Sequence, residues 1–411
     1  MPVNILRNET PARLRLWSLV CAVAATVLAA GLTVSAAGVR DQVEVIGTEA
    51  APQAATAADL YFALSDLDAQ VTRILVAGDS DELAGSRADA LGAYRDRGRQ
   101  VDGDLRLLLN STAEPAVVLR IMDGLAVYRQ RVGQALTAPA DRGHWTQATN
   151  LLHLRILPAA AELRTGSTER LNAAYRAKET YETAGLAVAL LLGGALLGLL
   201  IQLQVWMARR FRRSTNPALI AATVLSAALL AVSVTVLQLQ SRQLDGGRDD
   251  GLTPYLALSE LRALGYDAAA DTGRYLVSDR LSYYRDDFTG KAADLTAAGD
   301  GLDRLAGPEA AERWAGYQRV HLKILNLADA GRTEEAARLL TGIRRGDAAF
   351  DFAWFDASVA ETAAERKTAF DRALRAADTT LTGATVLPGV LLAVVVALLP
   401  LGVRRRLAEY R

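Results

Sequence analysis

The chain has 411 residues, with 46 lysines and arginines against 46 aspartates and glutamates, and 51% of its residues are hydrophobic. This hydrophobic content is high for a soluble protein, so a membrane protein is the first class to consider. Cys21 is the only cysteine, which excludes an intrachain disulfide and any metal site built from several cysteines.

Four uncharged stretches are each long enough to cross a bilayer as a helix, which takes about 20 residues. They cover residues 16–39, 184–208, 217–241 and 379–403. The first is longer than the apolar core of a cleavable signal peptide, so we expect it to be an uncleaved membrane anchor. The sequence therefore predicts an all-α membrane protein with four spans.

Arginines gather in the short segments that flank these stretches. Residues 209–216 contain Arg209, Arg210, Arg212 and Arg213, and residues 404–411 begin with Arg404, Arg405 and Arg406. Short positively charged segments remain on the cytoplasmic side of a membrane. Together with the basic tail 1–15, they predict a multi-pass protein of the cell membrane whose two termini are cytoplasmic. These arginines either set the topology alone or also bind an acidic partner or anionic lipid heads.

Two large segments, residues 40–183 and 242–378, are then expected outside the cytoplasm. Apolar residues recur in steps of three and four along both, which is typical of helices that pack in bundles. The clearest stripes in the first segment are Leu60, Leu64, Leu67, Val71 and Ile74; Leu91, Tyr94, Gly98, Val101, Leu105 and Leu108; and Val118, Ile121, Leu125, Tyr128 and Val132. Each segment is predicted to form its own antiparallel helical bundle.

An internal repeat supports a tandem duplication of a span–bundle–span unit. YFALSDLDA at 61–69 matches YLALSELRA at 255–263, which pairs Tyr61 with Tyr255 and Ser65 with Ser259. These four residues are our candidates for contact with a partner. The alternative is that they are packing residues retained after duplication.

Glycine and proline near the spans predict joints. The stretches GTEAAPQAAT at 47–56 and DGGRDDG at 245–251 contain the residues that usually interrupt helices. We expect a flexible connection just outside the first and third spans.

Motifs of catalysis are absent from the sequence: no GxxxxGK[ST], GxGxxG or HExxH pattern occurs. The three histidines, His144, His153 and His321, are far apart and are expected to be ordinary helix residues. We therefore predict no enzyme activity, no cofactor and no metal. The expected cytoplasmic segments total roughly thirty residues, too few for a domain with a core. A signal would leave them as a helix movement that a separate cytoplasmic protein reads.

The predicted layout resembles known sensors. The span–bundle–span units resemble the four-helix-bundle sensor modules of bacterial chemoreceptors and sensor kinases. The whole pattern, with the turn ARRFRR at 208–213, resembles the four-span membrane proteins of high-GC bacteria that are associated with a glutamine/glutamate-binding lipoprotein and a soluble serine/threonine protein kinase. The resemblance implies amino-acid sensing in which an external solute-binding lipoprotein contacts the external segments and a cytoplasmic kinase receives the signal.

The function predicted from these observations is that of a non-enzymatic transmembrane signal transducer. The alternatives are an accessory subunit of a membrane transporter, a structural envelope protein and a direct small-molecule sensor. A homodimer is left open, and no nucleic-acid partner is expected. Arg73, Arg120 and Arg274 are expected on solvated faces, without a cluster of convergent polar groups, so we expect a broad docking surface for a protein rather than a pocket.

Overall fold

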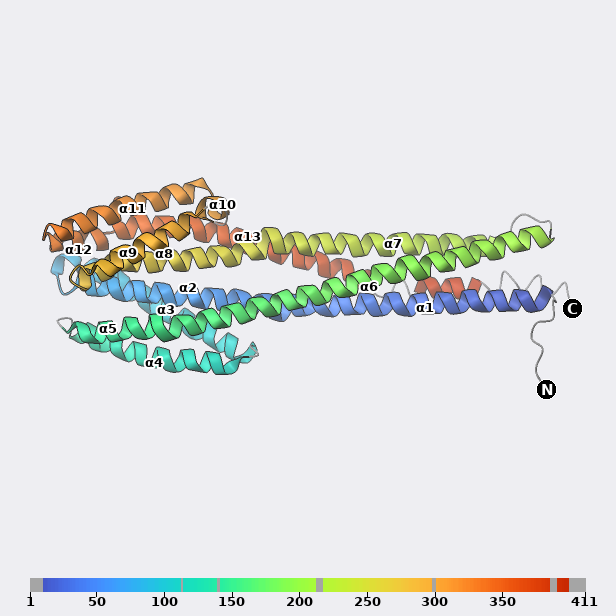
Figure 1. Ribbon diagram of the computed structural model, residues 1–411, viewed down its shortest axis with the longest axis horizontal. Helices are drawn as coiled ribbons and strands as arrows, with labels where there is room; N and C mark the ends of the chain where they lie inside the picture. Colours follow the sequence, from blue (N-terminus) through green and yellow to red (C-terminus); the bar gives the residue numbers. More distant parts are fainter. Residues whose placement is uncertain are drawn as a thin grey trace. The chain divides into compact units, whose positions relative to one another are not determined.

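The computed structural model describes residues 10–111, 114–138, 141–211, 217–297, 301–384 and 390–398. Figure 1 shows their helices in chain order. No β-strand occurs within these described ranges, so the all-α prediction is confirmed for them.

The chain divides into two compact units. Unit 1 comprises Met1–Gly47, Ala173–Gly247 and Arg372–Arg411, and unit 2 comprises Thr48–Asn172 and Arg248–Asp371. The predicted spans belong to unit 1, and most of the two predicted external segments belongs to unit 2.

Three helical stretches are long and apolar enough to cross a membrane: Arg15–Ala77, Arg142–Arg209 and Pro217–Val277. They fit a membrane protein and contain the first three predicted spans. Of the fourth predicted span, 379–403, the structure describes residues 379–384 and 390–398, all of them helical. The remainder lies outside the described residues.

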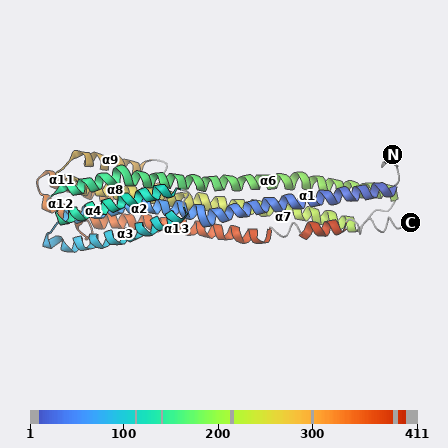
Figure 2. The same cartoon turned by 90° about the horizontal axis from the view of Figure 1, so that it is seen from below.

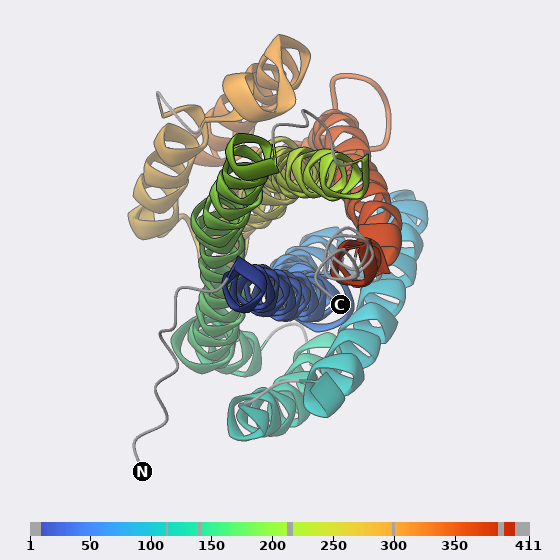
Figure 3. The same cartoon turned by 90° about the vertical axis from the view of Figure 1, so that its right-hand side faces the viewer.

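The core of unit 1 consists of apolar side chains from α1 (Thr10–Val45), α6 (Leu157–Phe211), α7 (Pro217–Gly247) and residues 390–398. Leu28, Leu196 and Leu229 are examples from the three long helices, and Leu392 comes from the fourth stretch. Figure 3 views these helices end-on.

The predicted flexible joints are instead helical. Helix α1 is followed directly by the π-helical turn η1 (Ile46–Ala50) and by α2 (Ala51–Ala77), and α7 is followed in the same way by η4 (Arg248–Leu252) and α8 (Thr253–Val277). Pro52 and Pro254 stand at the second positions of α2 and α8. A proline lacks the N–H group and crowds the carbonyl four residues earlier, and a wider π-turn relieves both problems without ending the helix.

The remaining helices belong to unit 2. In the first half of the chain they are η2 (Asp81–Leu83), α3 (Ala84–Ser111), α4 (Pro115–Thr137), α5 (Arg142–Leu151), the π-turn η3 (Leu152–Ile156) and the beginning of α6. In the second half they are α9 (Ser282–Thr296), α10 (Leu302–Ala306), α11 (Pro308–Asp329), α12 (Thr333–Thr341) and α13 (Ala348–Ala384), the last of which continues into unit 1.

The stripes predicted for the first external segment are largely confirmed as core positions. Val101, Leu105 and Leu108 of α3 are buried, as are Ile121 and Leu125 of α4. They pack with residues of α2, α5, η3 and α6 in one apolar cluster.

The two external segments belong together to unit 2. Helix α2 packs along α8, as Figures 1 and 2 show, and we call their contact the α2–α8 seam. Twenty of the 27 residues of α2 are buried. A helix buried on almost all sides has neighbours from both halves of the chain, so the arrangement as two tandem bundles is not confirmed.

Candidate functional site at the α2–α8 seam

The four residues predicted to contact a partner lie on the α2–α8 seam or close to it. Ser65 and Ser259 are each 3% exposed, and Tyr255 is also buried. The Tyr255 hydroxyl donates to both carboxylate oxygens of Asp59, at 2.7 and 2.8 Å. Tyr61 is half-buried beneath the Arg164 guanidinium, 4.9 Å from its ring centre. Packing within unit 2 accounts for these positions.

The structure also shifts the register of the repeat. Pro52 and Pro254 occupy the same place at the starts of α2 and α8, yet Tyr61 lies about two turns further into its helix than Tyr255 does. A displacement of about two turns leaves residues on nearly the same face of a helix, so an offset match of this kind can still look like a repeat.

A buried ion pair lies at the centre of the seam. The Arg274 guanidinium of α8 donates to the Asp68 carboxylate of α2 at 2.7 Å, and both side chains are 1% exposed. The second Asp68 oxygen accepts from the Tyr128 hydroxyl of α4 at 3.0 Å. Arg274 had been expected on a solvated face, and the structure shows that this was wrong.

Further charges surround this pair. Arg274 also pairs with Asp267 at 2.8 Å and with Asp271 at 2.6 Å, both on α8. Lys291 of α9 reaches the same two carboxylates, each at 2.7 Å, and Asp287 at 2.8 Å. We call this group, with Asp68, the seam network.

His153 of η3 completes the network from the first half of the chain. Its Nε2 lies 2.8 Å from an Arg274 nitrogen, and 3.7 Å from carboxylate oxygens of Asp68 and Asp267. Because Arg274 can only donate, the short contact needs a lone pair on Nε2, which the neutral ring supplies when its proton is on Nδ1. The network therefore joins α2, α4, η3, α8 and α9.

Burial and neighbouring charges set the pKa values in the network. Burial alone would raise the pKa of Asp68, but Arg274 and His153 together outweigh it and lower the pKa to about 2. The pKa of Asp267 is likewise lowered, because Arg274 and Lys291 outweigh its burial. For Asp271 burial prevails over these two cations and, with the charge of Asp267, raises the pKa to about 6. Asp267 and Asp271, one helical turn apart, thus have pKa values that are shifted in opposite directions.

The seam network suits a switch better than catalysis. Its four carboxylates exceed its two permanent cations, and each cation contacts three carboxylates. A small displacement of one helix could exchange ion-pair partners without leaving a buried charge unpaired, and buried polar networks specify one arrangement strongly while they are satisfied. No cluster of potential metal ligands is found among the described residues.

The histidines and the terminal arginines complete the predicted site residues. His321 is a core residue: it stacks on Phe288 with ring centres 3.5 Å apart, and burial lowers its pKa to about 3. Arg209 and Arg210 lie in the last turn of α6. The other predicted cytoplasmic arginines lie outside the described residues, namely Arg212, Arg213, Arg404, Arg405 and Arg406.

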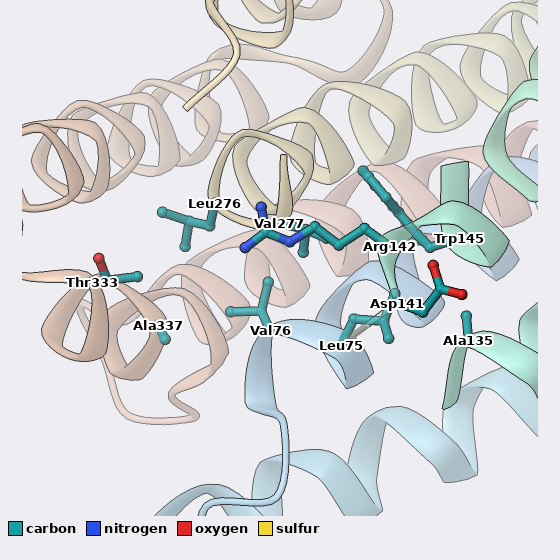
Figure 4. Close-up of a pocket in the computed structure, with 10 residues that line it drawn as sticks. All are labelled: Leu75, Val76, Ala135, Asp141, Arg142, Trp145, Leu276, Val277, Thr333 and Ala337. Atoms are coloured by element: carbon teal, nitrogen blue, oxygen red, sulfur yellow. The ribbon is translucent and has the colours of Figure 1, made fainter. Parts of the chain in front are cut away.

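A pocket of about 200 Å³ opens elsewhere on the same unit, where the helices of both halves end. Its lining residues are Leu75, Val76, Ala135, Asp141, Arg142, Trp145, Leu276, Val277, Thr333 and Ala337 (Figure 4). The pocket combines charged, aromatic and aliphatic side chains.

Comparison with known proteins gives one match. Residues 42–176 match the model of a family described as "Actinobacterial sensor domain". The match indicates a sensing or signalling role. It supports a sensor protein of high-GC bacteria, and the matched residues include Asp68, Tyr128 and His153 of the seam network. Neither the curated proteins nor the solved structures contained a match.

Sequence reasoning missed the seam network for an identifiable reason. Asp267, Asp271 and Arg274 are spaced by four and three residues, which places them on one face of α8, among small residues such as Ala270 and Gly273. Charged side chains on a face otherwise made of alanine and glycine were the available signal. The partner Asp68 could not be identified, because nothing local connects it to Arg274.

Proposed function

We propose that this chain is a non-enzymatic transmembrane signal transducer in which unit 2 receives an extracytoplasmic signal and continuous helices carry it through the membrane. The observation that carries this proposal is the continuity of two helical stretches. Arg15–Ala77 and Pro217–Val277 each include a span-length apolar segment and one helix of the α2–α8 seam, without an intervening loop. Displacements of about 1–2 Å between packed helices are typical of such transmission.

In this proposal the seam network is the element that switches between two arrangements of ion pairs. Lys291 and Arg274 share Asp267 and Asp271, so a shift of α8 against α2 would redistribute ion pairs between them. A ligand or partner can move such an equilibrium only by binding one arrangement more tightly than the other.

The proposed topology has four spans, unit 2 outside, and both termini in the cytoplasm. The arginines at 209–213 and 404–406 support it, because positive charge is retained on the cytoplasmic side. Single cysteines at Ser111, Ser214 and Ala357 in a Cys21→Ala background test it with a membrane-impermeant thiol reagent on intact cells. We expect labelling at positions 111 and 357 only; labelling at 214 alone would invert the topology.

The signal is proposed to arrive on an amino-acid-loaded solute-binding lipoprotein and to reach a cytoplasmic serine/threonine kinase. The resemblance to four-span sensors motivates these partners, and the sensor-domain match supports the sensing role alone. Helix α4 offers an outward apolar surface, since Leu119, Met122 and Val127 are 48%, 38% and 46% exposed. A stable protein interface buries about 1,200–2,000 Å² in total, so such a partner would extend well beyond these three residues.

A disulfide across the seam tests the transduction step. A Cβ atom at Gly273 would lie 3.6 Å from the Thr72 Cβ, close to the mean of about 3.8 Å in disulfides, so Thr72→Cys with Gly273→Cys should form a bond. In nanodiscs, ligand-loaded lipoprotein should change hydrogen exchange near Arg209 in the reduced protein and not in the oxidised one. An equal response in both forms would refute a moving seam.

The main rival, an accessory transporter subunit, predicts different partners. Such a subunit should purify with a permease and an ATPase, and its affinity for the lipoprotein should not depend on kinase signalling. Purification of the tagged chain after in-cell crosslinking distinguishes the two: recovery of the lipoprotein and a kinase supports transduction, and recovery of a permease complex supports the rival.

A further inference from the structure

The pocket of Figure 4 lies where the C-terminal end of α2, from the first half of the chain, meets the C-terminal end of α8, from the second half. Helix α2 ends with Arg-Ile-Leu-Val at 73–76, and α8 ends with Arg-Tyr-Leu-Val at 274–277. The Leu-Val pair of each helix lines the pocket, and the first turns of α5 and α12 complete it. Any ligand held there contacts both halves at once.

Two polar groups in the pocket have no partner. The Arg142 side chain is exposed and makes no ion pair or hydrogen bond with any residue that the structure describes. In Figure 4 it extends across the pocket toward Leu276 and Val277. Trp145 is 3% exposed, and its indole Nε1–H is buried without an acceptor in the described part of the chain. This atom is closed to the pocket, so Trp145 lines the pocket with its ring and Arg142 supplies the accessible donor.

The carboxylate in the pocket is already engaged. One oxygen of Asp141 accepts from the Gly143 backbone N–H at 2.9 Å and caps the start of α5. The other oxygen lies 3.7 Å from His144 Nε2, so Arg142 is the charged side chain of the pocket that pairs with none of the described residues. Helices α5 and α12 both begin at the pocket, at Arg142 and Thr333, and helix starts add partial positive charge and free N–H groups.

Aliphatic side chains form the rest of the wall. Leu75, Val76, Leu276 and Val277 come from the paired helix ends, and Ala135 and Ala337 lie beside them. The volume of about 200 Å³ exceeds that of an engineered apolar cavity of about 150 Å³ that binds benzene, so a six-membered ring with a short polar substituent fits.

We infer that this pocket binds a small carboxylate with an apolar body, whose charged group pairs with the Arg142 guanidinium while its body packs on the two Leu-Val pairs. A guanidinium and a carboxylate form a bidentate pair, which provides both affinity and orientation. Such a ligand bridges the ends of α2 and α8 and would bias the relative position of these helices. The site is a second input beside any docked protein, and its existence does not depend on that protein.

Calorimetry of the full chain in nanodiscs tests the site with phenylacetate as the probe. Phenylacetamide, which lacks the charge, and acetate, which lacks the apolar body, are the matched ligand controls. We expect saturable 1:1 binding of phenylacetate at millimolar concentrations or below, and no saturable binding of the two controls. Equal binding of phenylacetamide would overturn the inference, as would no binding of phenylacetate, benzoate and isovalerate.

Two variants locate the binding. Arg142→Gln should weaken phenylacetate binding roughly tenfold or more, through loss of a charge-assisted pair, and Trp145→Phe should weaken it less. Arg155→Gln is the control, since Arg155 is also exposed and lies outside the lining. An unchanged affinity in Arg142→Gln, with a melting curve like that of the parent, would refute the site. Loss of this binding would leave the disulfide and lipoprotein experiments unaffected, so the two proposals can fail separately.

Discussion

Arg274 and Asp68 are 206 residues apart in the chain and form a 2.7 Å ion pair in which each side chain is only 1% exposed. The pair connects the two halves of unit 2. A second ion pair of nearly the same length lies on the surface. Arg120 and Glu162 are 2.8 Å apart, and their side chains are 60% and 55% exposed. The two pairs differ in burial and hardly in length, which makes them a natural comparison.

Removal of the buried cation should be far more costly than removal of the exposed one. Arg274→Met removes the cation that pairs with Asp68 and leaves Lys291 to pair with Asp267 and Asp271, so it should lower the free energy of unfolding by about 3–5 kcal/mol. Arg120→Met should change it by about 1 kcal/mol or less, because exposed pairs contribute little. Denaturant melts of detergent-solubilised protein measure both. Similar small losses would show that the seam network is not a stabilising contact.

Two aspartates of the same network should respond to pH with opposite signs. The pKa of Asp271 is raised to about 6, above the ordinary value of about 4, so its carboxyl holds a proton more strongly in the folded chain. Its contribution to stability therefore falls as the pH rises from about 4 to about 6. Asn in its place cannot titrate, so the stability of Asp271→Asn relative to the parent should rise by on the order of 2–3 kcal/mol across this window.

Asp68 should show the opposite dependence of stability on pH. Its pKa is lowered to about 2, so its contribution is present above about pH 4 and is lost as the pH falls toward 2. Asp68→Asn should be strongly destabilised at neutral pH, and the difference from the parent should shrink below about pH 4. If the two variants gave parallel pH profiles, the assignment of opposite pKa shifts would be wrong.

Because α2 and α8 approach closely at Gly273, replacing this glycine while Thr72 is retained should lower the free energy of unfolding. A Cβ atom there would lie 2.5 Å from the Thr72 Cγ2, and threonine has few alternative rotamers in a helix. Gly273→Ala should therefore cost about 1–3 kcal/mol. Gly290→Ala, at an exposed position of α9 with no atom near the new Cβ, should instead gain up to about 1 kcal/mol from helix propensity. A neutral Gly273→Ala would indicate a looser seam.

Unit 2 should fold only from both halves together. The Arg248 side chain donates to Asn172 at 2.9 Å, so the cut ends are close and a Gly/Ser linker of about eight residues can replace the spans between them. The fusion of 48–172 to 248–371 should be helical and melt in one cooperative transition. Residues 48–172 alone expose the face of α2 that packs on α8, where Asp68 lacks its Arg274 partner, and should melt broadly or associate. Equal, cooperative melting of that fragment would contradict one shared domain.

Local features of the fold were predictable, and long-range ones were not. The stripes of α3 and α4 followed from a period of 3.6 residues, which depends only on neighbours in sequence. The seam escaped prediction because α2 is buried on almost every side, so it shows no contrast between an apolar and a polar face. Glycine and proline signals failed at residues 47–56 and 245–251 for a different reason: a π-turn keeps the helix continuous there, and sequence patterns do not distinguish that from a break.

The candidate sites show the same contrast between local features, which were predictable from the sequence, and long-range contacts, which were not. Arg142 and Trp145 belong to the short helix α5, while the opposite wall of their pocket comes from residues 276–277 and 333–337. Neighbours of such different sequence position come together only in the folded chain. Ser65 and Ser259 of the repeat were predicted to contact a partner, and both are buried within unit 2.

The separation of Asp68 from Arg274 also affects how this protein is made. A ribosome adds about 5–20 residues per second, so Arg274 emerges on the order of ten to forty seconds after Asp68. In that interval the second and third apolar stretches are synthesised, and the Asp68 carboxylate of α2 lacks its Arg274 partner. Unit 2 therefore closes only after those stretches have been handled by the membrane machinery. A chain in which their insertion stalls presents a half-formed domain to the proteases and chaperones of the cell envelope.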